Sequence, residues 1–248
     1  MHFLPRKRAI IVLLALVLWV VPASATLFTG TGIGVDGHFL SASADFTVSG
    51  GILQVVLTNT SRFDVLVPGD VLTGLFFHSD PSKLTPLSAL LAAGSQVFQG
   101  AKLISVASGN VGGEWAYVAG VGTSSSGYGI FNFANFHGPE LQGPKNGALD
   151  GVQYGILSAG DNTATGNKKI LESQLIKNSV TFKLSGATGP DFLSTITNVS
   201  FQYGTDLCEP NVTGISFSSV PVPATVWLLG SGLLGLGLSG WRRREKKA

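Results

Sequence analysis

The side chains that could perform chemistry are widely spaced along this chain. Three histidines follow the N-terminal segment, at His38, His78 and His137, and none pairs with the H-x-x-x-H or H-E-x-x-H spacing of a metal site. Tertiary folding would have to unite them. Serines are abundant, but no G-x-S-x-G nucleophile elbow occurs between the two terminal apolar segments. The pattern predicts no catalytic residue, no metal site and no cofactor.

Carboxylates offer another route to catalysis, because glycoside hydrolysis needs two opposed carboxyl groups. The candidates, which no spacing pairs, are Asp36, Asp45, Asp64, Asp70, Asp80, Glu114, Glu140 and Asp150. Most lie in turn-like segments, where a solvated carboxylate is expected. A calcium ion that bridges loops near Asp150 or Asp161 is an open alternative, because oxygen ligands alone are sufficient to bind calcium. No D-x-D-x-D-G spacing occurs, however.

Three further features have a structural interpretation. "GTGIG" (30–34) lacks the Lys-Ser/Thr of a phosphate loop and is expected to be a flexible entry to the first strand. Cys208 is the one cysteine, so no intrachain disulfide forms; a partly buried, inert thiol is favoured over a reactive one. Trp115, Tyr117 and Tyr128 are the aromatic residues to test for sugar contact, with core packing as the favoured role.

The elements that position these residues are expected to be short strands. Runs of β-branched and aromatic residues alternate with Gly, Asn, Asp and Ser, as in "ILQVVLTNTS" (52–61) and "SVTFKLSG" (179–186). The pattern predicts a mainly β fold, an antiparallel β-sandwich or jelly-roll-like domain. Short helices are expected around Leu87–Ala93 and in "KKILESQLIKNS" (168–179), and long loops over 108–151.

Both ends of the chain are apolar segments flanked by positive charge. Arg6-Lys7-Arg8 precedes an uncharged run over 9–21 and then small residues, Ala23 and Ala25, at positions −3 and −1 of a predicted cut. Residues 1–25 are therefore predicted to be a secretory signal helix, with a permanent anchor as the alternative. Residues 224–241 predict one C-terminal transmembrane helix, which the basic tail 242–247 would stop on the cytoplasmic side. The stop-transfer residues are Arg242, Arg243 and Arg244.

The segment between these ends, 26–219, is expected to be one extracytoplasmic domain. Eight of the chain's 16 Lys and Arg residues lie in the two terminal segments, as does one of its 14 acids, so the segment has a net charge of −5. Nucleic-acid binding requires clustered basic residues on the folded part. The charge distribution argues against a nucleic-acid partner. Asn-x-Ser/Thr matches begin at Asn59, Asn198 and Asn211 and are interpreted as chance.

The C-terminal segment, 220–248, resembles a known class of bacterial sorting signal. Val220-Pro221-Val222-Pro223-Ala224 is followed by "WLLGSGLLGLGLSGWRRR", an order similar to the PEP-CTERM class and its Val-Pro-Leu-Pro-Ala variant. Val222 stands where the variant has leucine and the Pro-Glu-Pro form has glutamate. The resemblance implies an exosortase-type membrane enzyme as partner, a transient membrane anchor, delivery to the surface or extracellular matrix of a Gram-negative cell, and exopolysaccharide as a further candidate partner.

The extended Pro-rich motif would expose backbone to an enzyme at the membrane surface. The overall interpretation is a non-enzymatic exported protein with a structural, adhesive or polysaccharide-associated role. Two alternatives stay open: a secreted carbohydrate-active enzyme with the same tail, and a single-span membrane protein that is never processed.

Overall fold

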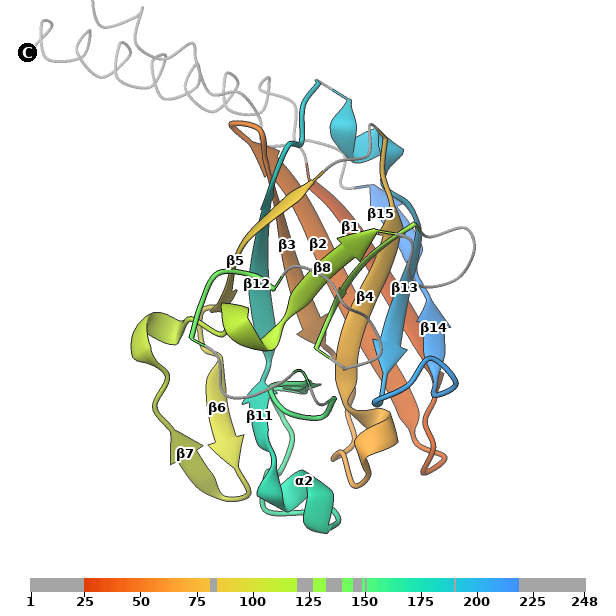
Figure 1. Cartoon of the computed structure of the whole chain (residues 1–248). Coiled ribbons are helices and arrows are strands. Elements are labelled where there is room, and N and C mark those ends of the chain that lie inside the picture. Colours follow the sequence, from red (N-terminus) through yellow and green to blue (C-terminus); the bar gives the residue numbers. More distant parts are fainter. Residues whose placement is uncertain are drawn as a thin grey trace, which may run out of the picture. The chain divides into compact units, whose positions relative to one another are not determined.

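The structure is a computed structural model that describes residues 25–80, 84–119, 127–132, 140–144, 149, 151–189 and 191–218. Ala23–Ser218 form one compact unit, and the mainly β prediction is confirmed. Within the described ranges the chain builds two sheets, which Figure 1 shows as two facing layers. No helix in those ranges is long and apolar enough to cross a membrane. The predicted signal helix and the predicted helix over 224–241 lie outside them.

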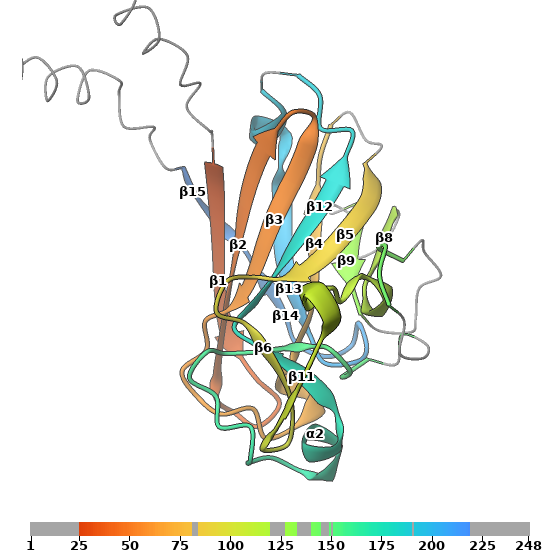
Figure 2. The ribbon, with the colours of Figure 1, turned by 90° about the vertical axis from the view of Figure 1, so that its left-hand side faces the viewer.

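The first sheet, sheet A, is antiparallel throughout, with the order β15-β1-β2-β3-β12-β5 (Figure 2). Its strands are β1 (Ala25–Ile33), β2 (Phe39–Ser49), β3 (Ile52–Asn59), β5 (Thr85–Leu91), β12 (Ser179–Ser185) and β15 (Ile215–Ser218). β3 alternates strictly between buried and partly exposed residues, and β2 alternates in the same way as far as Thr47. One face of sheet A therefore belongs to the core and the other faces solvent.

The second sheet, sheet B, has the main order β14-β13-β4-β10-β11-β6-β7, and the β8–β9 hairpin pairs with β4. Its strands are β4 (Leu72–His78), β6 (Gln96–Gln99), β7 (Lys102–Ile104), β8 (Ala116–Ala119), β9 (Tyr128–Phe131), β10 (Ile156–Leu157), β11 (Gln174–Lys177), β13 (Thr197–Tyr203) and β14 (Asn211–Thr213). β10 and β11 are parallel, so the expectation of a wholly antiparallel domain is wrong at this pair. Helix α2 (Lys168–Glu172) lies in the crossover between these two strands.

Aromatic side chains join the two sheets into one core. Phe46 of β2 is fully buried and packs edge-on against Phe77 of β4, with ring centroids 5.5 Å apart. Trp115, which precedes β8, packs in the same way on Phe182 of β12 at 4.9 Å. Edge-to-face contacts of this kind add to the burial of the rings and fix how the sheets face each other.

The helix expected around Leu87–Ala93 is wrong, because this segment forms edge strand β5. β5 pairs with β12, and the register shifts beside Pro86. Proline is tolerated on an edge strand because it lacks an amide donor, and pairing along β12 outweighs the local helix propensity. The short helix expected within 168–179 is confirmed as α2, which Asn167 caps by accepting the N–H of Ile170.

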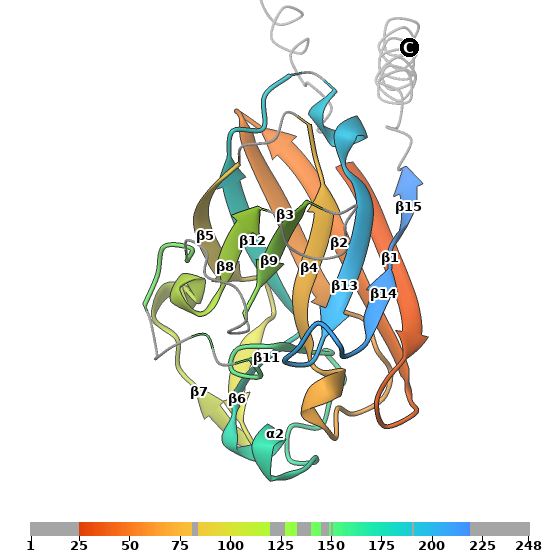
Figure 3. The same cartoon turned by 45° about the vertical axis from the view of Figure 1, so that its right-hand side comes forward.

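β1 and β15 bring the two ends of the described domain together. They pair antiparallel from Thr26↔Ser218 to Thr29↔Ile215. Figure 3 shows β14 and β15 as successive strands, the first beside β13 in sheet B and the second beside β1 in sheet A. The chain therefore changes sheets at Gly214 and ends its last strand where its first strand begins.

Residues 30–33 of the "GTGIG" segment belong to β1, so the segment is not a flexible entry to the strand, and Gly34 follows directly after β1. A Cβ on Gly30 would lie 2.9 Å from Phe201 Cδ2 and 2.9 Å from the Thr213 carbonyl oxygen. Glycine is needed here because β1 lies close against β13 and β14 where the two sheets meet.

We expect Gly30→Ala to lower the free energy of unfolding by about 1–3 kcal/mol, because an added methyl group must displace both a ring and a backbone oxygen. Gly160→Ala is the matched control: no heavy atom lies within 4 Å of a Cβ there, and its effect should stay within about 0.5 kcal/mol. Chemical denaturation measures both. Equal effects of the two substitutions would contradict the close packing of β1.

Candidate functional site

Most of the predicted sorting residues lie outside the described residues. This applies to Ala23, to the motif Val220–Ala224 and to Arg242–Arg244. Ala25, at position −1 of the predicted signal cut, is the first residue of β1. These assignments stay predictions from the sequence.

The aromatic residues considered for sugar contact are core residues. Trp115, Tyr117 and Tyr128 are 0%, 4% and 9% exposed, and the two tyrosine rings stack on each other with centroids 6.0 Å apart. Core packing, the favoured role, is therefore what the structure gives them. A sugar ring cannot stack on side chains enclosed between two sheets.

The histidines do not meet in the described part of the chain. His38 lies in the turn between β1 and β2, whereas His78 ends β4, eight residues after Asp70; His137 lies outside the described residues. Among the residues that the structure describes, no three His, Cys, Asp or Glu side chains are grouped as metal ligands would be.

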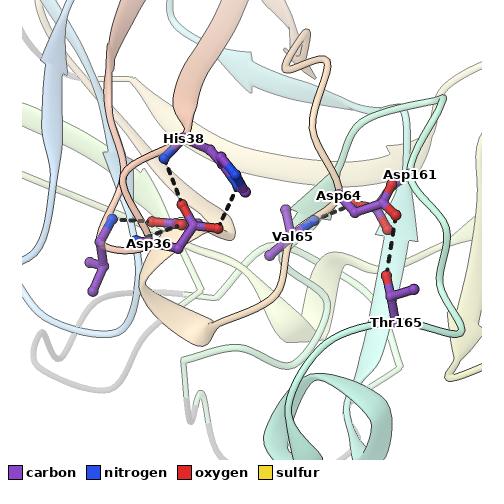
Figure 4. Close-up of polar contacts among 8 residues, drawn as sticks. Asp36, His38, Asp64, Val65, Asp161 and Thr165 are labelled. Carbon is purple, nitrogen blue, oxygen red and sulfur yellow. Dashed lines mark hydrogen bonds and ion pairs between the residues drawn. The ribbon is translucent and has the colours of Figure 1, made fainter.

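Two carboxylates and a histidine do come together at the β1–β2 turn, where the close-up of Figure 4 shows Asp36 beside His38. Asp70, at the end of a short 3-10 helix (Pro68–Asp70), accepts the Val35 N–H at 2.6 Å and the Asp36 N–H at 3.3 Å. Asp36 in turn accepts the His38 N–H and bonds to His38 Nδ1, each at 2.9 Å. We call Asp36, His38 and Asp70 the turn cluster; it ties the β1–β2 turn to the segment that leads into β4.

The geometry of the backbone requires glycine beside this cluster. A Cβ on Gly34 would lie 2.5 Å from Asp70 Oδ1, so a larger residue would push the carboxylate off the amides it accepts. This contact explains the last glycine of "GTGIG" as a packing requirement.

The two carboxyl groups of the turn cluster have opposite pKa shifts. Burial and the hydrogen bond to Asp36 raise the pKa of Asp70 to about 6, against the Val35 and Asp36 amides, which favour its ionised form. Burial also raises the pKa of Asp36, but its hydrogen bonds to Asp70 and His38 and the charge of His38 outweigh burial, so the net pKa is lowered. One proton is therefore held between the two groups in mildly acidic solution.

A second acidic pair, Asp64 and Asp161, organises the neighbouring loops (Figure 4). Buried Asp161 accepts the Val65 N–H at 2.8 Å, and Asp64 accepts the Asn162 N–H at 3.0 Å. Burial raises the pKa of Asp161 to about 6. Backbone amides thus occupy one oxygen of each carboxylate, and Asp150, the other residue named for a bridging calcium ion, lies outside the described residues.

We expect the free energy of unfolding to rise as the pH falls from 7 towards 4. Asp70 and Asp161 have folded-state pKa values near 6, above the unfolded value of 3.8, so the folded protein binds these protons first. Each shift is worth up to about 3 kcal/mol. Below about pH 4 the lowered pKa of Asp36 acts in the opposite direction.

Thermal melting between pH 7 and pH 4 measures this dependence. Asp70→Asn and Asp161→Asn should each flatten the rise, whereas Asp80→Asn, at an exposed residue, should leave it unchanged. A melting temperature that falls steadily from pH 7 to pH 4 would contradict the assignment.

The turn cluster has the wrong geometry for glycoside hydrolysis. Two catalytic carboxyl groups stand about 5 Å or more apart on either side of a sugar. Asp36 and Asp70 instead share a hydrogen bond, and Asp70 is 2% exposed. What the arrangement can do is orient the half-exposed His38 imidazole through Nδ1 and fasten the turn.

The expectation that Cys208 is partly buried is wrong, because its side chain is exposed. Cys208 lies between β13 and β14, and its N–H is donated to Asp206 Oδ1 at 3.0 Å. The interior of this loop is taken by the Glu209 carboxylate, which accepts the N–H groups of Thr205 and Asp206. The Glu209 carboxylate fills the loop, and the Cys208 thiol is exposed to solvent.

Sequence reasoning missed the turn cluster and the exposed apolar residues of sheet A. Asp36 and Asp70 are 34 residues apart, and no local pattern joins them. A signal for the exposed apolar residues was present: β1 contains Leu27 and Phe28 in succession, so both faces of the strand are apolar there.

Comparison with known proteins identifies the tail. Residues 219–244 match the family model of the PEP-CTERM protein-sorting motif, as the resemblance at Val220–Ala224 predicts. No match was found among curated proteins or solved structures. A PEP-CTERM tail marks an exported, cell-surface protein that is processed by an exosortase, a membrane enzyme.

Proposed function

We propose that this protein, whose tail directs it to an exosortase, is a non-catalytic surface or extracellular-matrix component built on a β-sandwich. The precursor is held in the inner membrane by the helix predicted over 224–241, with the basic residues 242–247 in the cytoplasm. The exosortase then removes the tail and releases the domain for a structural or adhesive role beside exopolysaccharide. The match at residues 219–244 carries this proposal.

The described domain supports a binding or structural role over catalysis. The acids that do meet, Asp36 with Asp70 and Asp64 with Asp161, accept backbone amides and hold turns in place. The aromatic residues first considered for sugar contact pack between the sheets. A polysaccharide partner would therefore meet the outer surface of the sheets, where serine and threonine side chains of β1 and β2 face outward.

Intact-mass analysis of the protein from its native host tests the proposal. The expected mature chain begins near Thr26 and lacks 227–248. A mass that retains Arg242–Lys247 would identify an unprocessed single-span protein instead. Hydrolysis of a polysaccharide by the purified domain, lost on Asp36→Asn, would identify the carbohydrate-active enzyme.

A further inference from the structure

Three exposed apolar side chains lie together at the end of sheet A where the domain begins and ends. Leu27 is 37% exposed, Ile215 66% and Phe217 56%. In the β1–β15 ladder Leu27 is opposite Phe217, and Thr29 is opposite Ile215. Directly opposed residues in an antiparallel pair share a face, and the neighbouring Phe28 is buried in the core. The three residues therefore form one strip on the outer face, which we call the edge strip.

The edge strip lies at the attachment point of both terminal segments. Ser218, the last residue of β15, pairs with Thr26, the first residue after the predicted signal cut. Five residues, 219–223, separate Ser218 from the predicted transmembrane helix. They span at most about 17 Å when fully extended. This tether keeps the strip within reach of the lipid headgroups for as long as the tail is attached.

The chemistry of the strip suits a lipid surface. Leucine, isoleucine and phenylalanine side chains insert at the boundary between headgroups and acyl chains. Two residues that share the face of the strip, Thr29 of β1 and its partner Ser43 of β2, are small and uncharged. One acid, Asp45 of β2, faces Leu27, and burial raises the pKa of its carboxyl group.

We propose that the edge strip, Leu27 with Ile215 and Phe217, seats the domain on the outer surface of the membrane until the tail is removed. This inference rests on the membrane anchoring in the proposed function. Seating orients the domain with its Val220–Ala224 motif at the membrane surface, where a membrane enzyme cuts. Release of the tail then frees a strip of apolar surface at the same moment as it frees the domain.

A fluorescent label at the strip tests the proposal. The signal-free full chain, residues 26–248 with Cys208→Ser, is reconstituted in vesicles of phosphatidylethanolamine and phosphatidylglycerol. One variant carries Thr29→Cys, opposite Ile215 on the face of the strip, which leaves all three strip residues in place, and the control carries Phe39→Cys. Phe39 is 64% exposed and opposite Ile33, on the same face of sheet A and about 14 Å further along β1 than the Thr29↔Ile215 pair. A polarity-sensitive fluorophore on each cysteine reports quenching by nitroxide lipids and by aqueous iodide.

The label at Thr29 should be quenched several-fold more by nitroxide lipid, and several-fold less by iodide, than the label at Phe39. Adding Ile215→Ser and Phe217→Ser should bring the quenching of the Thr29 label close to that of the control while the chain stays in the membrane after an alkaline wash. Circular dichroism checks that the variant keeps its sheets. The proposal is overturned if iodide quenches the two labels equally in protein that keeps Leu27, Ile215 and Phe217 and remains in the membrane. That result would leave the proposed function intact.

Two other occupants of the strip would also overturn the proposal. If the label is protected from iodide only when an exosortase-type enzyme is added, the strip binds the enzyme. If its protection from iodide increases with the protein-to-lipid ratio, the strip binds a second copy of the chain. The alkaline wash is carried out before any fluorescence is measured. If the wash removes the chain from the membrane, the predicted membrane anchor is refuted, and so is the seating of the domain that depends on it.

Discussion

Replacing Phe46 with alanine is expected to lower the free energy of unfolding by about 3–5 kcal/mol. The ring is fully buried and contacts two other aromatic rings edge-on, Phe28 and Phe77, each with centroids 5.5 Å away. Phe77 belongs to sheet B, so the substitution opens a cavity between the two sheets. A stability of 5–15 kcal/mol is typical of a domain, and this loss is a large part of it.

Phe39→Ala is the matched control, because Phe39 begins the same strand and is 64% exposed. Its effect should stay within about 0.5 kcal/mol. Chemical denaturation of the processed protein compares the two variants. If the free energies of unfolding of the two variants differed by less than about 1 kcal/mol, the result would contradict the role of Phe46 in packing the two sheets together.

Replacing both Pro221 and Pro223 with alanine is expected to leave the tail on the protein. Proline lacks an amide donor and keeps the residue before it extended, so the motif stays open to an enzyme at the membrane surface. With alanine at both positions the helix predicted to begin at Ala224 is free to continue upstream, and its hydrogen bonds would hide the backbone that must be cut. Intact-mass analysis reports retention of 227–248.

Val222→Leu is the control for the motif. It restores the leucine of the Val-Pro-Leu-Pro-Ala variant that the tail resembles, so processing should continue as in the unchanged protein. Efficient release of the tail from the double proline variant would contradict an extended motif as the requirement for cleavage. Export itself should continue in all three proteins, because residues 1–25 are unaltered.

The strands were predictable where burial alternates with a period of two. Val180, Phe182 and Leu184 of β12 alternate with Thr181 and Lys183 in the sequence, and the buried and exposed faces follow that alternation. β5 was not predictable in this way. Its apolar run has no alternation, and what decides its conformation is the backbone of β12, which lies more than 80 residues further along the chain.

The candidate site was less predictable than the strands. The pairing of Asp36 with Asp70 depends on a turn and a short 3-10 helix that meet only in the folded domain. The exposure of Cys208 depends on the Glu209 carboxylate, which fills the loop beside it. In both cases a hydrogen bond from the backbone to a side chain sets the outcome, and composition does not encode which amide will be near.

The sequence by itself determined the sorting tail, because such a signal is defined by the order of residues along the chain: Pro-x-Pro, an apolar run, then arginines. Hydrophobicity and charge at adjacent positions are sufficient for that. The tertiary structure alone decided that Thr26 and Ser218 are neighbours, and that Leu27, Ile215 and Phe217 share one surface. Contacts between residues almost 200 positions apart depend on strand register and sheet packing. No local sequence pattern indicates them.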